Sequence, residues 1–252
     1  MPKKQVSQDR KARIAELQQQ EKARENRVRI RIIAAAAALL LVLGGVIAYA
    51  VVDAGKQRPE VAISAIGVPA SAASCDPPTT DKAGGNGTHV GPNTDSPNTS
   101  RVKYNTVPPS TGPHYAQPAV TNNRAFYTAA DRPAMEILVH NLEHGYTVLW
   151  YDQAAGEAKE MKAKLEDLAK VTNKLDPSAN KFIVSAWDPS YGALPAGKKF
   201  ALSHWSATLA ADKSSVASQE GHRQLCGDLS GEVVKAFVEK FPRTSAPEPG
   251  AG

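Results

Sequence analysis

The feature that most constrains this chain runs from residue 32 to residue 52 and reads IIAAAAALLLVLGGVIAYAVV, 21 residues without a charged side chain. A helix of this length spans roughly 30 Å, the thickness of the hydrocarbon core of a bilayer. A secretory signal peptide is the alternative, but its apolar core is shorter, about 7 to 15 residues. The small-residue motif Ala70-Ser71-Ala72 also lies too far along the chain to be its cleavage site. We therefore predict one transmembrane helix over residues 32–52.

The charge on the two sides of this stretch predicts its orientation. Residues 1–31 carry ten Lys or Arg against four Asp or Glu, and the residues just after 52 show no such excess. The positive-inside rule then keeps residues 1–31 in the cytoplasm as a basic, helix-prone tail and exports the rest of the chain. The remaining 20 basic and 21 acidic residues give the exported part a charge of about −1. The overall charge of +5 therefore predicts contact with a cell membrane and no nucleic-acid partner.

Both cysteines, Cys75 and Cys226, lie beyond the predicted membrane helix. An even number of cysteines in an oxidising compartment favours a disulfide. A pair of metal-binding thiolates is the alternative, but no C-x-x-C spacing supports it. We predict a Cys75–Cys226 disulfide.

The exported part divides by composition. Residues 53–74 are mostly small or polar and indicate a linker, and residues 243–252 indicate a poorly ordered tail. Between them, residues 75–242 are predicted to form one extracytoplasmic domain. Its first part, to about Pro118, is rich in Pro, Gly, Asn, Thr and Ser, so it is either disordered or held by the folded domain for function.

Regular secondary structure is predicted from residue 135 onward. Strand-forming residues at 135–139 and 146–151 flank Asn-Leu-Glu-His-Gly, which indicates an antiparallel hairpin. The later segments are predicted as an amphipathic helix at 153–173, strands at 181–187 and 200–211, and a helix at 225–241 that ends before Pro242. This order predicts a single small α+β domain with an antiparallel or mixed sheet and covering helices.

Two histidines and a glutamate interrupt the apolar run from Met135 to Tyr151. His140, Glu143 and His144 have the spacing H-x-x-E-H, which one class of metalloproteases carries on a helix. The strand-forming neighbours and Gly145 favour the hairpin instead. A hairpin still brings the two imidazoles across from each other at about 5 Å. Glu143 could then bind a metal or orient one imidazole.

A third candidate ligand, His114, lies in the sequence VPPSTGPHYAQP. Its prolines stiffen the backbone and Gly112 permits a turn, so the loop can present the imidazole. The alternative is a proline-rich lid that covers the sheet and leaves His114 exposed.

These motifs resemble a bacterial membrane-anchored family known as domain of unknown function 3105. The matching elements are His89-Val90, the segment from Tyr104 to His114, the segment from His140 to Gly145, and Pro247-Glu248. Ser110-Thr111 stand where the family has Thr-Ser, a swap of small consequence. His204, in ALSHW, falls where a small residue is expected, which makes it a weaker candidate ligand. The resemblance implies a related fold and a membrane-anchored location, but no activity.

The resemblance strengthens a metal hypothesis, because the elements that carry it contain the histidines. We predict a transition-metal site, zinc or copper, with the ligands His114, His140, His144, Glu143 and His89. Met135 is a possible soft ligand, although a single Met at such a position is more typical of core packing. The aromatic residues are predicted to pack on the sheet: Trp150, Tyr151, Trp187 and Trp205.

Three functions are compatible with these features. The first is a membrane-tethered module that binds a transition metal outside the cytoplasm. The second is a metal-dependent hydrolase of the cell envelope with Glu143 as general base, for which no separate acid is evident. The third is a metal-free structural or interaction domain whose histidines hold the proline-rich segment by hydrogen bonds.

Overall fold

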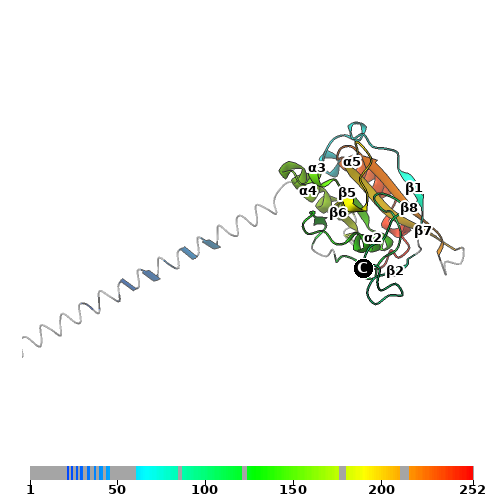
Figure 1. Cartoon of the computed structure of the whole chain (residues 1–252). Helices are drawn as coiled ribbons and strands as arrows, with labels where there is room; N and C mark the ends of the chain where they lie inside the picture. The colour runs from blue at the N-terminus through cyan, green and yellow to red at the C-terminus, as the bar shows by residue number, and fades with distance from the viewer. Residues whose placement is uncertain are drawn as a thin grey trace, which may run out of the picture. The chain divides into compact units, whose positions relative to one another are not determined.

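The computed structural model describes residues 61–84, 87–120, 124–175, 180–210 and 216–251, together with scattered helical residues between 22 and 45 (Figure 1). The chain divides into two units, Met1–Pro59 and Glu60–Gly252. Within the described part of the chain, no helix has the length and apolarity needed to cross a membrane. The transmembrane helix predicted at 32–52 and the basic tail at 1–31 lie largely outside the described residues.

The second unit is built on a mixed six-stranded sheet with the order β1-β8-β7-β5-β6-β4. Its strands are β1 (Thr79–Lys82), β4 (Phe126–Tyr127), β5 (Thr147–Tyr151), β6 (Phe182–Ala186), β7 (Phe200–Leu209) and β8 (Val216–Cys226). Neighbours from β1 to β5 are antiparallel, whereas β5, β6 and β4 are parallel. A separate parallel pair joins β2 (His89–Val90) to β3 (His114–Tyr115). The predicted α+β class with a mixed sheet is confirmed.

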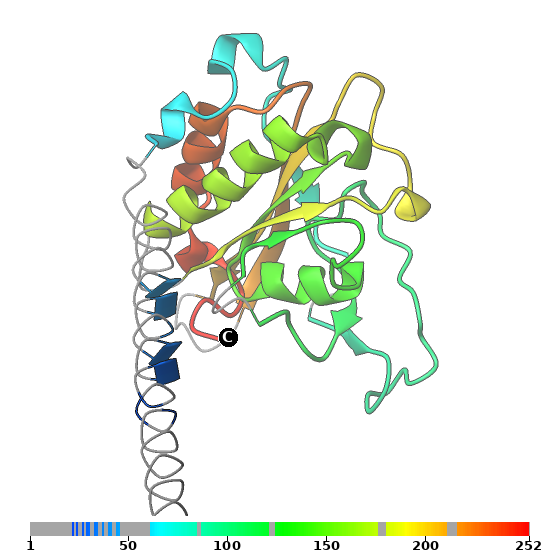
Figure 2. The same cartoon turned by 90° about the vertical axis from the view of Figure 1, so that its left-hand side faces the viewer.

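Alternating side chains of the central strands form two apolar cores. In β5, Leu149 and Tyr151 contribute to the core covered by helices α4 (Lys159–Leu175) and α5 (Gly231–Lys240). Val148 and Trp150 point the other way, into the core covered by helix α2 (Met135–Glu143). Figure 2 shows α4 and α2 on opposite sides of the sheet. The four predicted packing aromatics are all buried: Trp150, Tyr151, Trp187 and Trp205.

The hairpin predicted at 135–151 is wrong, because its first half is the helix α2. The apolar residues Met135, Leu138, Val139 and Leu142 follow helical spacing, and Met135 packs in the core. Eight of the nine residues of α2 are buried, so the contrast between faces that would separate helix from strand is lost. The helix ends in a Schellman motif: Gly145, at φ +88°, donates its backbone N–H to Leu142 and Tyr146 donates to Asn141.

The other predicted elements are closer to the structure. Strands β6 and β7 are confirmed, and the helix predicted at 153–173 is present as α3 (Gln153–Gly156) followed by α4. The helix predicted at 225–241 begins only at Gly231, because Leu225 and Cys226 end the eleven-residue strand β8. Strand β8 was not predicted, since its exposed half carries polar residues without apolar alternation.

Residues 61–74 differ from the linker expected over 53–74. They form the short 3-10 helices η1 (Ile63–Ala65) and η2 (Ala70–Ala72), and Ile63, Ile66 and Ala73 are buried in the core beside α5. This part of the segment therefore belongs to the folded unit; residues 53–60 lie outside the described part of the chain.

The proline-rich segment is ordered by buried polar contacts. Asp81 on β1 forms an ion pair with Arg223 on β8 and accepts a hydrogen bond from Ser110. Gly221 makes this contact possible, because a Cβ atom there would lie 2.0 Å from the Ser110 hydroxyl oxygen. The loop that leads to His114 is thereby fixed against the edge of the sheet.

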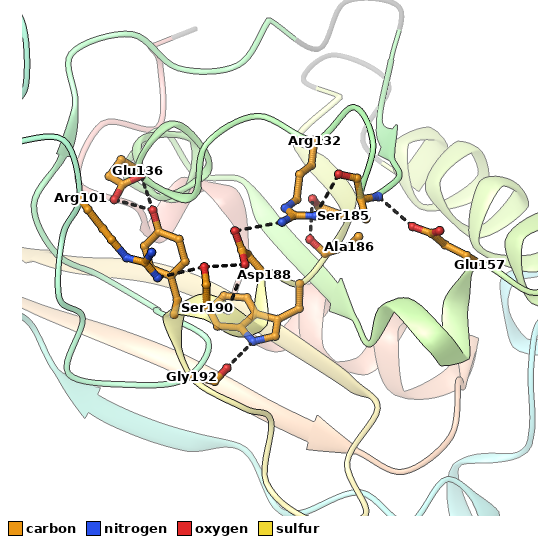
Figure 3. A network of polar contacts seen from close by, with 12 residues as sticks. Arg101, Arg132, Glu136, Glu157, Ser185, Ala186, Asp188, Ser190 and Gly192 are labelled. Carbon is orange, nitrogen blue, oxygen red and sulfur yellow. Dashed lines mark hydrogen bonds and ion pairs between the residues drawn. The ribbon is translucent and has the colours of Figure 1, made fainter.

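A second polar network holds the start of α2 (Figure 3). The fully buried carboxylate of Glu136 accepts hydrogen bonds from the Val102 backbone N–H and the Tyr191 hydroxyl. Arg101 lies over the Tyr191 ring and donates to Ser190. The network ties residues 101–102 to α2, so the proline-rich segment is fixed to this helix as well as to the sheet.

The predicted disulfide between Cys75 and Cys226 is confirmed. It joins the start of the proline-rich segment to the end of β8.

The expected disorder of residues 243–252 is wrong for the described residues up to 251. The 3-10 helix η4 (Arg243–Ser245) is followed by the buried Ala246, and the Glu248 backbone N–H donates to the Glu143 carbonyl.

Candidate metal centre

Four histidines from three distant parts of the sequence meet beside α2. His89 and His114 are paired residues on β2 and β3, and His140 and His144 lie one turn apart at the end of α2. The ring centroids of His114 and His140 are 4.7 Å apart, and those of His140 and His144 are 4.4 Å apart. His89 lies 5.0 Å from both His114 and His140. We call these four residues the histidine cluster.

Carboxylates complete two overlapping groups whose candidate ligand atoms lie within 4.8 Å of one another. The inner group contains His89, His114, His140 and Glu143, and all but His89 are buried. The outer group contains Glu143, His144 and Glu248. The structure thus brings all five predicted ligands together and adds Glu248, which sequence reasoning had placed in a disordered tail. The Pro247-Glu248 element of the family resemblance is the sequence feature that points to Glu248 as part of the site.

Backbone carbonyls select the tautomers of two inner histidines. Nδ1 of His114 lies 2.9 Å from the Gly112 carbonyl, and Nδ1 of His140 contacts the Tyr115 carbonyl. A carbonyl can only accept, so each Nδ1 carries the proton and each Nε2 is left with a free lone pair when the ring is neutral. Metal-binding histidines commonly have this arrangement, in which one nitrogen is held by a backbone carbonyl and the other faces the ion.

The two free Nε2 atoms face other polar atoms at short range. Nε2 of His114, fully buried, lies 3.0 Å from a carboxylate oxygen of Glu143 without hydrogen-bond alignment. Nε2 of His140 lies 2.9 Å from Nε2 of His144. A buried polar atom without a partner costs about 1 to 3 kcal/mol, so a cation or a proton between these atoms is needed for a stable arrangement.

Burial lowers the pKa of two imidazoles of the cluster. It lowers the pKa of His140 to about 4, and the neighbouring imidazoles act in the same direction. Burial also lowers the pKa of His144. Burial alone would raise the pKa of Glu143, but its contacts with His114 and His140 keep it below the ordinary value. At neutral pH His140 and His144 are therefore neutral and Glu143 is ionised, which are the forms that bind metals.

Residues 96–252 match the family described as "Protein of unknown function (DUF3105)". The chain belongs to this family. The match contains His114, His140, Glu143, His144 and Glu248, whereas His89 lies before it. Neither curated proteins nor solved structures gave a match to this DUF3105 protein.

Two further histidines of this DUF3105 protein lie in other surroundings. His222 stacks on Phe241 at 4.0 Å between ring centroids and contacts the Thr80 hydroxyl. His204 is fully buried on β7, where Nδ1 lies 3.2 Å from the Tyr146 carbonyl and Nε2 lies 3.3 Å from the Ser245 hydroxyl. His204 thus connects β7 to η4 and belongs to neither ligand group.

His204 predicts loss of stability in mild acid. Burial lowers its pKa to about 4 from the 6.5 of an exposed imidazole. Between these values the unfolded chain binds a proton that the folded protein excludes, so the free energy of unfolding falls as the pH falls from about 6.5 to about 4. The full loss from this residue is about 3 kcal/mol. We expect urea unfolding at pH 7.5 and pH 5 to show a smaller difference for His204→Asn than for the wild type. If the free energy of unfolding falls by the same amount between pH 7.5 and pH 5 in both proteins, His204 does not cause the loss of stability in acid.

Proposed function

We propose that this DUF3105 protein is a membrane-tethered, extracytoplasmic module that binds a transition metal at the inner group. The single observation that carries the proposal is the direction of two buried imidazoles. Carbonyls of Gly112 and Tyr115 hold the Nδ1 atoms of His114 and His140, which leaves their Nε2 lone pairs beside the Glu143 carboxylate and the other imidazoles.

The donor set suits zinc or copper. Three imidazole nitrogens and one carboxylate oxygen are ligands that Zn(II) accepts in tetrahedral sites, and imidazole also binds Cu(II). Ligands at about 2.0 to 2.1 Å from zinc lie roughly 3.3 Å apart in a tetrahedron. The 3.0 Å between Nε2 of His114 and the Glu143 oxygen is close to that value, so little rearrangement would be needed.

The proposal is tested by metal binding to the full chain, purified in detergent with its affinity tag removed. We expect one tightly bound Zn(II) or Cu(II) ion per chain by elemental analysis and calorimetry. At a free metal concentration 1,000 times the dissociation constant, binding adds about 4 kcal/mol to the free energy of unfolding. The thermal shift should vanish on chelation. A wild-type chain that binds neither metal more tightly than about 10 μM would exclude the function.

The location of the domain is part of the same proposal. Described apolar side chains between residues 30 and 45 are well exposed, with Ile33, Leu40 and Leu41 at 61, 70 and 78 %. Lipid tails would cover such side chains, and the basic residues before them favour a cytoplasmic N-terminus. Protease added to intact spheroplasts should remove the domain and spare the basic tail. The reverse result would invert the orientation.

A metal-dependent hydrolase is a second candidate, because the H-x-x-E-H residues lie on a helix and its C-terminal cap, as they do in one protease class. In such an enzyme Glu143 would act as general base rather than as a ligand. Cavities of about 590, 340 and 520 Å³ lie elsewhere in the described residues, and none of the three is lined by the histidine cluster. We favour the binding module, because Glu143 lies among the imidazoles as a fourth donor rather than apart from them as a base. Metal retained by Glu143→Gln, with loss of a hydrolytic activity, would favour the enzyme.

A further inference from the structure

The outer group points to a second metal position beside the first. We propose that Glu143, His144 and Glu248 bind a second ion, with the Glu143 carboxylate shared between the two positions. The candidate ligand atoms of the outer group lie within 4.8 Å of one another. A carboxylate has two oxygens and can bind one cation through each. This inference rests on the proposed function, because it assumes that the inner group holds a metal.

An unsatisfied nitrogen of His144 supports the second position. Its ring is buried, and its Nδ1 has no hydrogen-bond partner among the described residues. If Nε2 carries the proton and donates to His140, Nδ1 is a bare buried acceptor. If Nδ1 carries the proton instead, two Nε2 lone pairs face each other at 2.9 Å. Both neutral tautomers leave an unpaired lone pair. With Nδ1 protonated, a cation beside Nε2 relieves the second arrangement by accepting one of the two facing lone pairs.

The chain end supplies the remaining ligand. Nε2 of His144 lies 3.4 Å from a carboxylate oxygen of Glu248. The hydrogen bond from the Glu248 backbone N–H to the Glu143 carbonyl fixes this residue against the end of α2. Because 56 % of the Glu248 side chain is exposed, the outer position opens to solvent, whereas His114, His140 and Glu143 are buried.

The contacts also predict the order of binding. An ion in the inner group takes the lone pair of His140, so His144 loses its hydrogen-bond acceptor and becomes available to the outer position. The first divalent ion balances the two carboxylates, Glu143 and Glu248. The second ion then meets an uncompensated positive charge at short range. We therefore expect two steps, with the second at least tenfold weaker.

The test is zinc titration of the full chain in detergent, with calorimetry and elemental analysis of the wild type and two matched variants. Glu248→Gln removes the outer carboxylate charge. Glu239→Gln is the control, because Glu239 is similarly exposed, at 62 %, and forms a surface pair with Lys235. We expect two ions for the wild type and the control, and one ion, with the tight step unchanged, for Glu248→Gln. Circular dichroism should show equal folding.

Each other result has a distinct meaning. A single ion in the wild type, or two ions in Glu248→Gln, overturns the second position and leaves the inner site standing. Loss of the tight step in Glu248→Gln also overturns it, because Glu248 would then belong to a single site. A wild-type chain that binds no zinc, and no copper in a parallel titration, overturns both proposals.

Discussion

Replacement of His140 by alanine is expected to weaken Zn(II) or Cu(II) binding by at least 100-fold. The residue supplies a buried Nε2 whose direction is set by the Tyr115 carbonyl, and it is within 5.0 Å, centroid to centroid, of each of the other three rings. Changing even the outer partners of metal ligands costs about 10- to 100-fold in affinity, so the loss of a ligand should cost at least the upper value. Calorimetric titration of the full chain measures the difference.

His222→Ala is the matched control for this variant. His222 is also a buried histidine with a lowered pKa, but it packs on Phe241 and belongs to neither ligand group. Its replacement should lower the free energy of unfolding and leave the metal affinity unchanged. If His140→Ala and His222→Ala bind metal equally well, the histidines of the cluster serve only the hydrogen bonds that hold the proline-rich segment.

The proximity of the candidate ligands could be predicted from sequence, although the element that carries two of them was assigned wrongly. Residues four apart lie close together on one face of a helix, and they also lie close together across a tight hairpin. The spacing of His140 and His144 is therefore compatible with either structure. Burial on nearly all sides of α2 removed the amphipathic pattern that separates the two structures. The predicted proximity of the two imidazoles is therefore correct for a different geometric reason.

The parts that could not be predicted depend on polar and backbone contacts. The chain end after Pro242 has few apolar residues. It is held by the hydrogen bond from the Glu248 backbone N–H to the Glu143 carbonyl and by the contacts of the Ser245 hydroxyl with His204 and Ser206. Gly221 provides the space for Ser110 in the loop before His114, a contact between residues far apart in the sequence. Likewise, the tautomers of His114 and His140 depend on carbonyls that only the folded chain brings into place.

Removal of the disulfide by Cys226→Ser is expected to lower the melting temperature by about 10 to 20 °C. The bridge joins residues 151 apart in sequence, so it excludes many extended conformations of the unfolded chain. In the chain-entropy model a loop of this length contributes up to about 5 kcal/mol to the free energy of unfolding. For a domain of this size, 1 kcal/mol corresponds to roughly 2 to 4 °C in melting temperature.

Two controls separate the bridge from the cysteine side chains themselves. The double variant Cys75→Ser/Cys226→Ser should melt at the same temperature as the single variant, which shows that the remaining free thiol is not the cause. Reductant should lower the melting temperature of the wild type and leave both variants unchanged. A decrease of less than about 3 °C on removal of the bridge would contradict the model, because the contacts of η1, η2 and Asp81 would then suffice to hold the start of the proline-rich segment. In that case the bridge would add little to the order of the loop that presents His114. Ser110 and Arg223, whose polar contacts also hold this loop, would be the next residues to replace.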